Sequence, residues 1–167
     1  MEDYYILALD TSGNWDFIAC VVFKPRYVRS LEGHVASLDR RVRSKIIRDV
    51  LEFIDDNCYG VCLNAKIRYR VRELRRFRNN KRWAWEYSVY LSLKSISQHL
   101  KNKNYWPISE VYADGEFQSF VRQIATNFNT TNIHIGKYSE TVLADVLAYV
   151  NLRQPCLLKK YRNIIEL

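Results

Sequence analysis

Three aspartates stand at positions where a packed core normally excludes an acid. Asp10 and Asp114 each follow a short apolar run, and Asp145 is the one charged residue in residues 141–152. A carboxylate that is buried without a partner loses its water, so these positions indicate that something cationic meets them. Clustered carboxylates repel one another and bind hard cations such as Mg²⁺ or Mn²⁺, which also bind phosphate oxygens. The three residues therefore predict metal-assisted cleavage of phosphodiester bonds, in which two ions act and no serine or histidine nucleophile is needed.

Each aspartate also has a purely structural interpretation. An Asp directly after a strand commonly caps a turn, which alone would explain Asp10 or Asp114. Asp145 could be a buried side chain that is satisfied by hydrogen bonds to the backbone. Two acids at equivalent strand ends and a third on an otherwise uncharged helix favour a common site over three separate explanations.

Glu86 is the fourth candidate ligand. It lies three residues before Val89, and the apolar residues Val89, Leu93, Ile96 and Leu100 recur at helical spacing in residues 82–101. Glu86 thus falls on the inward stripe of a predicted helix, near its start. The alternative is that a glutamate in the first turns stabilises the helix dipole whatever the function.

The elements that must position these acids follow from hydrophobic periodicity. Continuous or alternating apolar runs predict strands, and apolar residues three and four positions apart predict helices. Strands are expected at residues 4–9, 17–23, 59–71, 111–113 and 132–135, and helices at residues 38–54, 82–101, 117–124 and 139–152. Residues 157–167 fit either a helix or a strand. This order predicts one α/β domain over residues 1–167, a mixed five-stranded sheet with helices on both faces.

The charge of the chain points to a polyanionic partner. The formal net charge is +8 and the sequence pI is about 9.4. Nine basic residues and one acid lie between Lys66 and Arg82, whereas a solvated face usually mixes both signs. Binding to a phosphate backbone releases counterions, so a nucleic acid is the expected partner, although a membrane surface is also polyanionic. The residues expected to bind nucleic acid are Arg68, Arg70, Arg72, Arg75, Arg76, Arg78, Lys81 and Arg82.

Aromatic residues in and beside this basic stretch have two interpretations. Tyr69, Trp83 and Trp85 are placed to stack on bases or sugars. Core packing is the alternative, and we expect it for at least one of the tryptophans.

Composition argues against several other classes. The four cysteines and three histidines are scattered, with no CxxC pair and no two histidines at ligand spacing, so a zinc site is not expected. No apolar run is long enough to cross a bilayer, and the first residues lack the pattern of a secretion signal. A cytoplasmic location without membrane contact is therefore expected.

The order of the acids resembles the ribonuclease H-like superfamily of nucleases. Its members carry an acid on the first strand, a Glu on a helix, an acid on the fourth strand and an acid on the last helix. Asp10, Glu86, Asp114 and Asp145 match those positions in order. The resemblance implies that these four residues are catalytic and hold two Mg²⁺ or Mn²⁺ ions.

Local motifs are similar to three different branches of this superfamily. Residues 79–82, Asn-Asn-Lys-Arg, resemble the segment before the helical Glu of type 1 ribonucleases H. Residues 143–148, Leu-Ala-Asp-Val-Leu-Ala, are similar to the last helix of RuvC-type Holliday-junction resolvases. Asp114-Gly115, together with the early helix before the third strand, looks more like type 2 ribonucleases H.

The chain also departs from two of these branches. Type 2 enzymes have a Glu directly after the first Asp and a Gly-rich segment that reads a ribose hydroxyl, where this chain has Thr11 and residues 12–14, Ser-Gly-Asn. RuvC-type enzymes often have a second acid three residues before the helical Asp, where this chain has Val142. The subfamily therefore stays open.

Three functions are consistent with these residues. The first is a metal-dependent nuclease acting on an RNA/DNA hybrid, structured DNA or RNA. The second is a nucleic-acid-binding relative with the same fold and no catalysis. The third follows from residues 10–13, Asp-Thr-Ser-Gly, which resemble the first phosphate loop of actin-like kinases and ATPases, proteins that need two such domains. A dimer is possible for a resolvase, because a junction is two-fold symmetric.

Overall fold

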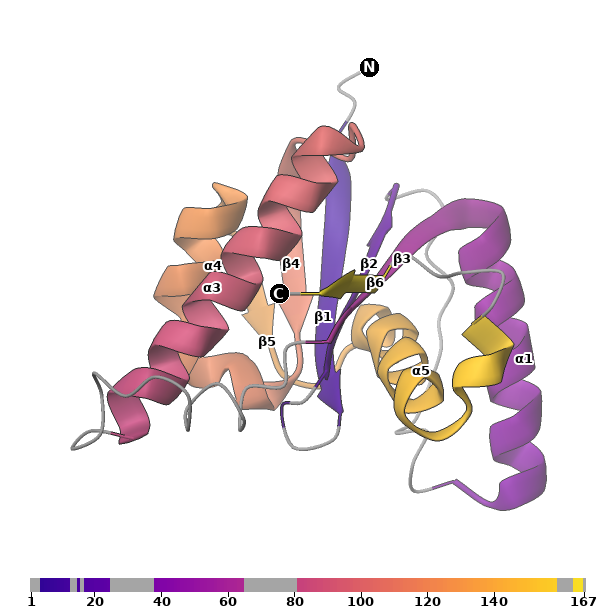
Figure 1. The fold of residues 1–167 in the computed structure, drawn as a ribbon. Coiled ribbons are helices and arrows are strands. Elements are labelled where there is room, and N and C mark those ends of the chain that lie inside the picture. Colours follow the sequence, from indigo (N-terminus) through magenta and orange to yellow (C-terminus); the bar gives the residue numbers. More distant parts are fainter. Residues whose placement is uncertain are drawn as a thin grey trace.

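The computed structural model describes residues 4–12, 15, 17–24, 38–64, 81–158 and 164–166. A six-stranded sheet runs through the centre of the fold in the order β5-β4-β1-β2-β3-β6 (Figure 1). The strands are β1 (Tyr5–Ser12), β2 (Phe17–Phe23), β3 (Cys58–Asn64), β4 (Ile108–Ala113), β5 (Ile133–Ile135) and β6 (Ile164–Glu166).

The sheet is mixed, as predicted. β1, β2 and β3 are antiparallel neighbours, whereas β4 runs parallel to β1 and β5 runs parallel to β4. The five predicted strands are present, and the open assignment at the end of the chain resolves to β6, which pairs in parallel with β3. Residues 65–71, the alternating part of the predicted third strand, lie outside the described residues.

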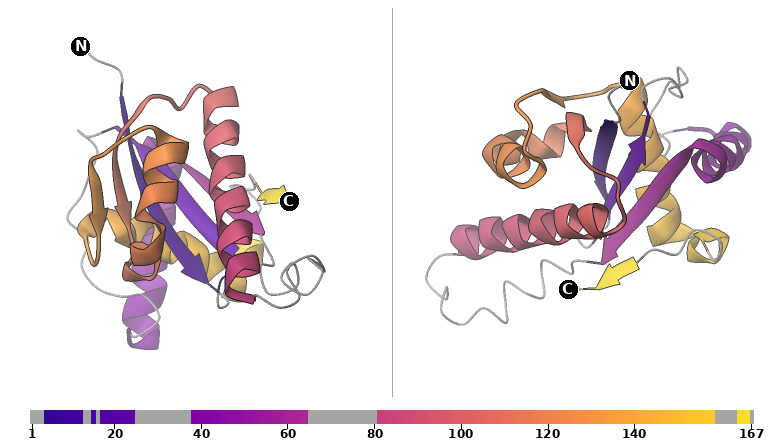
Figure 2. Two further views of the ribbon diagram at one scale, coloured as in Figure 1. Left: turned by 90° about the vertical axis from the view of Figure 1, so that its left-hand side faces the viewer. Right: turned by 90° about the horizontal axis from the view of Figure 1, so that it is seen from above.

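Helices cover both faces of this sheet (Figure 2). They are α1 (Arg40–Asn57), α3 (Lys81–Asn102), α4 (Val121–Phe128) and α5 (Ser139–Arg153), with short 3₁₀ helices η4 (Gly115–Phe120) and η5 (Pro155–Leu158). None of the helices in the described part of the chain is long and apolar enough to span a membrane.

The alternation of side chains along β1 divides the core into two layers. Leu7 and Leu9 pack in the layer that contains the inward residues of α3 and α4. Ile6 and Ala8 pack on the opposite face, among residues of α1 and α5. Asp10 is the next residue in the Ile6 and Ala8 series, so period two directs its side chain toward the α5 layer.

The segment after Asp114 differs from the prediction. A single short helix was expected at residues 117–124, but the structure has η4 followed directly by α4. The buried side chains explain the difference: Phe117 and Phe120 are three residues apart, the repeat of a 3₁₀ helix, whereas Ile124 and Phe128 are four apart, as in an α-helix. The 3₁₀ turn directs both phenylalanines into the core directly after the strand.

α3 and β4 run in opposite directions, so the start of α3 lies at the same end of the molecule as the end of β4. A short connection, residues 103–107, joins the two elements, so α3 runs back along β4 in the opposite direction. In Figure 1 the first turn of α3 and the C-terminal ends of β1 and β4 all lie toward the lower end of the molecule. The start of the helix and the two strand ends thus lie toward the same end of the molecule.

Candidate metal centre

The strand ends bring Asp10 and Asp114 side by side. β1 and β4 are parallel, and Leu9 pairs with Ala113 at the end of β4. The Asp114 N–H continues this pairing by donating to the Leu9 carbonyl at 3.1 Å. The next residue along each strand is therefore an aspartate, at the edge of the sheet where α/β proteins place their ligands.

Asp145 reaches the same edge from α5. This helix packs across β1 and β2 on one side and against α1 on the other, which explains why its sequence is apolar all round. The carboxyl group of Asp145 shares a hydrogen bond with that of Asp10. Both residues are buried, with exposures of 4% for Asp10 and 9% for Asp145, so the two acids form a carboxyl pair inside the protein.

Burial is the main cause of an unusual pKa at Asp10. Desolvation, then the negative charges of Asp145 and Asp114, raise the pKa of Asp10 from 3.8 to about 9. The Thr11 N–H, which donates to Asp10 Oδ1 at 2.7 Å, acts in the opposite direction and lowers it. Metal-free Asp10 thus holds a proton at neutral pH, and this proton and a bound cation would neutralise the same negative charge.

The donor set suits a divalent cation chemically. Three carboxyl groups converge, and carboxylate oxygens are the preferred ligands of Mg²⁺ and Mn²⁺. Ser12, two residues after Asp10 on the same side of β1, has a buried hydroxyl oxygen with no hydrogen-bond partner among the described residues, a polar group that a ligand could satisfy. Within the described ranges, no three His, Cys, Asp or Glu side chains are already arranged as metal ligands.

Glu86 occupies the predicted helix but has a different partner. It lies in the second turn of α3, where its carboxylate accepts a bond from Arg82 Nε at 3.2 Å. Its side chain is 39% exposed. The charges that raise the pKa of Asp10 come from Asp145 and Asp114, so the structure brings together three of the four predicted acids. Glu86 as a ligand stays a prediction.

A further acid that sequence reasoning missed lies beside the cluster. Glu116 accepts a hydrogen bond from the Thr11 hydroxyl at 2.5 Å, and its N–H donates to Asp114 Oδ2 at 3.3 Å. Asp114 is therefore also the N-cap of η4, so the turn-capping interpretation holds for it alongside any ligand role. The Asp-x-Glu spacing after a strand is the sequence signal that could have identified Glu116. No sequence pattern indicates its hydrogen bond to Thr11.

Most of the predicted basic surface lies outside the described residues. This holds for Arg68, Arg70, Arg72, Arg75, Arg76 and Arg78, and also for Tyr69. Lys81 begins α3, and Arg82 follows it with a side chain that is 83% exposed. These two cations stay predicted nucleic-acid contacts.

The two neighbouring tryptophans have different surroundings. Trp83 is 61% exposed, as a stacking residue requires. Trp85 is partly buried and meets Trp15 and Phe120 edge-on, with ring centroids 5.4 and 4.9 Å away. Trp85 therefore packs in the core, as we expected of at least one tryptophan.

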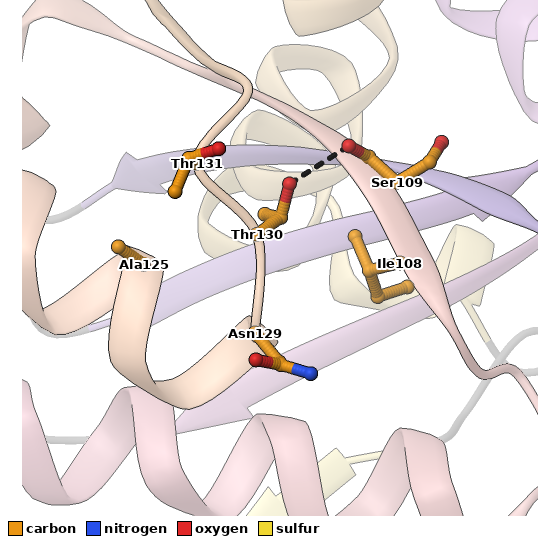
Figure 3. Close-up of a pocket in the computed structure, with 6 residues that line it drawn as sticks. All are labelled: Ile108, Ser109, Ala125, Asn129, Thr130 and Thr131. Carbon is orange, nitrogen blue, oxygen red and sulfur yellow. Dashed lines mark hydrogen bonds between the residues drawn. The ribbon is translucent and has the colours of Figure 1, made fainter.

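A hollow of about 420 Å³ lies at the opposite end of β4 (Figure 3). Its rim includes Ile108 and Ser109 at the start of the strand and Asn129, Thr130 and Thr131 after α4. Thr130 closes part of it by donating to the Ser109 carbonyl at 2.8 Å. No lining residue is charged, so this hollow is separate from the carboxylate cluster in both place and chemistry.

Comparisons with known proteins address the fold. No protein-family model matches this chain, and no curated protein matches it in sequence. Among solved structures, a chain of the PCNA:RNase HII complex from Archaeoglobus fulgidus matches with a TM-score of 0.56 and 16% sequence identity, covering 94% of this chain and 78% of that chain. Together with the mixed sheet and its flanking helices, this likeness shows that the chain has a ribonuclease H-like α/β fold.

Proposed function

We propose that this protein is a divalent-metal-dependent nuclease that hydrolyses phosphodiester bonds in nucleic acid. The observation that carries the proposal is the hydrogen-bonded pair Asp10 and Asp145 beside Asp114 at one edge of the sheet. Burying acidic side chains against one another is unfavourable, and a purely structural role would not need any of these positions to carry a charged residue. A bound cation offsets this cost and gives the arrangement a chemical purpose.

Asp10, Asp114 and Asp145 would hold the metal, with two ions expected for in-line displacement. Such ions activate the attacking water and stabilise charge on the phosphate and leaving oxygens. The protein's own contribution is to orient the ligands. The Thr11 N–H fixes one oxygen of Asp10, the Glu116 N–H fixes one oxygen of Asp114, and α5 holds Asp145 out of bulk water.

Charge and topology support a nucleic-acid substrate. The net charge of +8 favours a polyanion, and Arg82 and Trp83 are exposed near the start of α3, at the same end of the fold as the strand ends (Figure 1). The solved neighbour is named RNase HII, so an RNA/DNA hybrid is the first substrate to test. Structured DNA and RNA are the next substrates to test.

A non-catalytic nucleic-acid-binding protein is the second candidate. One observation favours it: the described carboxylates are not already arranged as a set of three metal ligands. In that case the fold and the positive charge would serve binding alone.

Labelled substrates separate the two functions. The purified protein is incubated with Mn²⁺ or Mg²⁺ and a panel of hybrid, duplex, branched and single-stranded substrates. We expect metal-dependent cutting of at least one member, and Asp10→Asn should lower its rate by about 100-fold or more while binding is retained. Binding without cutting by the wild type, on every substrate and with both metals, would establish the non-catalytic function instead.

A further inference from the structure

Thr11 connects two carboxylates of different elements. Its N–H donates to Asp10 Oδ1 at 2.7 Å, and its hydroxyl donates to Glu116 Oε2 at 2.5 Å. Glu116 in turn donates its own N–H to Asp114 Oδ2 at 3.3 Å. A continuous chain of hydrogen bonds therefore runs from Asp10 through Thr11 and Glu116 to Asp114.

The core fixes the place of Glu116. The next residue, Phe117, is fully buried, and its ring meets Trp15 at a centroid distance of 4.9 Å. The Phe117 N–H also bonds to the Asp114 carbonyl at 2.9 Å. With Asp114 paired to β1 on one side and Phe117 anchored on the other, the backbone of Glu116 has little freedom, and it stands beside the end of β1.

The Glu116 side chain points toward other acids, although repulsion between like charges favours the opposite direction. This residue is exposed, so its carboxylate could point into water, away from the acids of the cluster. It is instead held by the hydroxyl of Thr11, the residue that follows Asp10. Like charges that are brought together in this way repel, unless a cation binds between them.

We propose that Glu116 is the fourth carboxylate of the cation site, in the role predicted for Glu86, and that Thr11 is the residue that positions it. This inference rests on the proposed metal-dependent function. Glu86 is bound by Arg82 along the surface of α3. Glu116 instead accepts a bond from Thr11, the neighbour of Asp10, and donates its N–H to Asp114 itself. Glu116 would ligate a Mg²⁺ or Mn²⁺ ion directly or through one of its waters.

Mn²⁺ binding without nucleic acid is the test, because it has a readout besides cleavage. The affinity of the full chain is measured by calorimetry and by the electron paramagnetic resonance of free Mn²⁺. Glu116→Gln should weaken the tightest site by about tenfold or more, and by more than Glu86→Gln does. Thr11→Val should weaken it by about three- to tenfold through loss of the hydroxyl, and Thr11→Ser should restore it. Glu52→Gln, a change of the same kind on the exposed surface of α1, is the matched control.

The outcomes distinguish this inference from the proposed function. Wild-type protein that cleaves in Mn²⁺, with Glu116→Gln binding the ion within twofold of wild type, would overturn the role of Glu116 alone. A larger loss in Glu86→Gln than in Glu116→Gln would overturn it too and return the fourth position to Glu86. Wild-type protein that neither binds Mn²⁺ nor cleaves would overturn the proposed function, and the role of Glu116 with it. Unfolding curves for each variant separate a lost ligand from a lost fold.

Discussion

Asp10 and Asp145 share a hydrogen bond between two carboxyl groups, one within a central strand, two residues before its end, and one inside an apolar helix. Such a bond requires that one carboxyl group carries a proton, and burial places that proton on Asp10 with a pKa of about 9. In the metal-free protein the Asp10 member of the pair is therefore uncharged. Raising the pH or binding a cation removes the proton, with opposite effects on stability.

The first prediction concerns stability against pH in the metal-free protein. Because the folded-state pKa of Asp10 lies above its ordinary value of 3.8, the folded chain binds more protons than the unfolded chain between these values. The contribution of Asp10 is thus greatest below about pH 4 and is lost as the pH rises to about 9. Between about pH 5 and pH 8.5 this loss should be on the order of 3 kcal/mol.

Denaturant unfolding in a chelator checks this effect. Asp10→Asn cannot ionise, so the free energy of unfolding of this variant should fall less with pH than that of wild type. Asp49→Asn, at an exposed position of α1, should keep the wild-type slope. Parallel slopes for wild type and Asp10→Asn would contradict the raised pKa.

The second prediction concerns the cation itself. A ligand that binds only the folded state raises the melting temperature by an amount that grows with the logarithm of its concentration divided by its Kd. Mn²⁺ should therefore stabilise the wild type, and more strongly at about pH 8 than at about pH 6, since the ion competes with the proton on Asp10. Asp145→Asn should lose most of this stabilisation and lower any cleavage rate by about 100-fold or more. An equal Mn²⁺ shift in wild type and Asp145→Asn, measured by thermal denaturation, would exclude Asp145 as a ligand.

The fold was largely predictable because its signals are local. The apolar run of β2 predicted Phe17–Phe23, the observed bounds, and the helical repeat predicted residues 139–152 of α5, which ends one residue later at Arg153. Asp10 and Asp114 were recognisable because each follows such a run, and parallel pairing of β1 and β4 then brought them together. Asp145 was recognisable as a lone charge in an apolar helix.

The remaining features depend on contacts between distant residues. Thr11 and Glu116 are separated by 105 positions, and nothing in either local sequence requires their hydrogen bond. Periodicity predicts an inward position for Glu86, but its side chain is 39% exposed and its carboxylate is paired with Arg82, four residues earlier on the same helix. A helical pattern specifies which way a residue faces, whereas the partner of a long side chain depends on what else lies within its reach.

The third prediction tests the anchor beneath the site. Phe117 is fully buried against Trp15 and follows Glu116 directly. Phe117→Ala should lower the free energy of unfolding by about 3–5 kcal/mol, the usual cost of removing a buried aromatic ring. Phe117→Leu should cost less because it leaves a smaller cavity. If denaturant unfolding gives less than about 1 kcal/mol for Phe117→Ala, η4 is not anchored by this ring.

The last prediction concerns nucleic-acid binding at the start of α3. Trp83 exposes 61% of its surface, near Arg82 and at the end of the fold that carries the carboxylates. Stacking of one base on an exposed aromatic ring contributes about 1–3 kcal/mol, so Trp83→Ala should weaken binding of single-stranded or hybrid substrates by about 5- to 100-fold.

Arg82→Ala should weaken binding and lower the dependence of the logarithm of affinity on the logarithm of salt concentration by about one, as expected when one phosphate contact is lost. Fluorescence anisotropy in a chelator measures both effects without cleavage, and Arg48→Ala on α1 is the control for a generic loss of positive charge. An unchanged salt slope in Arg82→Ala would mean that the helix start does not contact the backbone, and the predicted interface would then be confined to other basic residues of the chain.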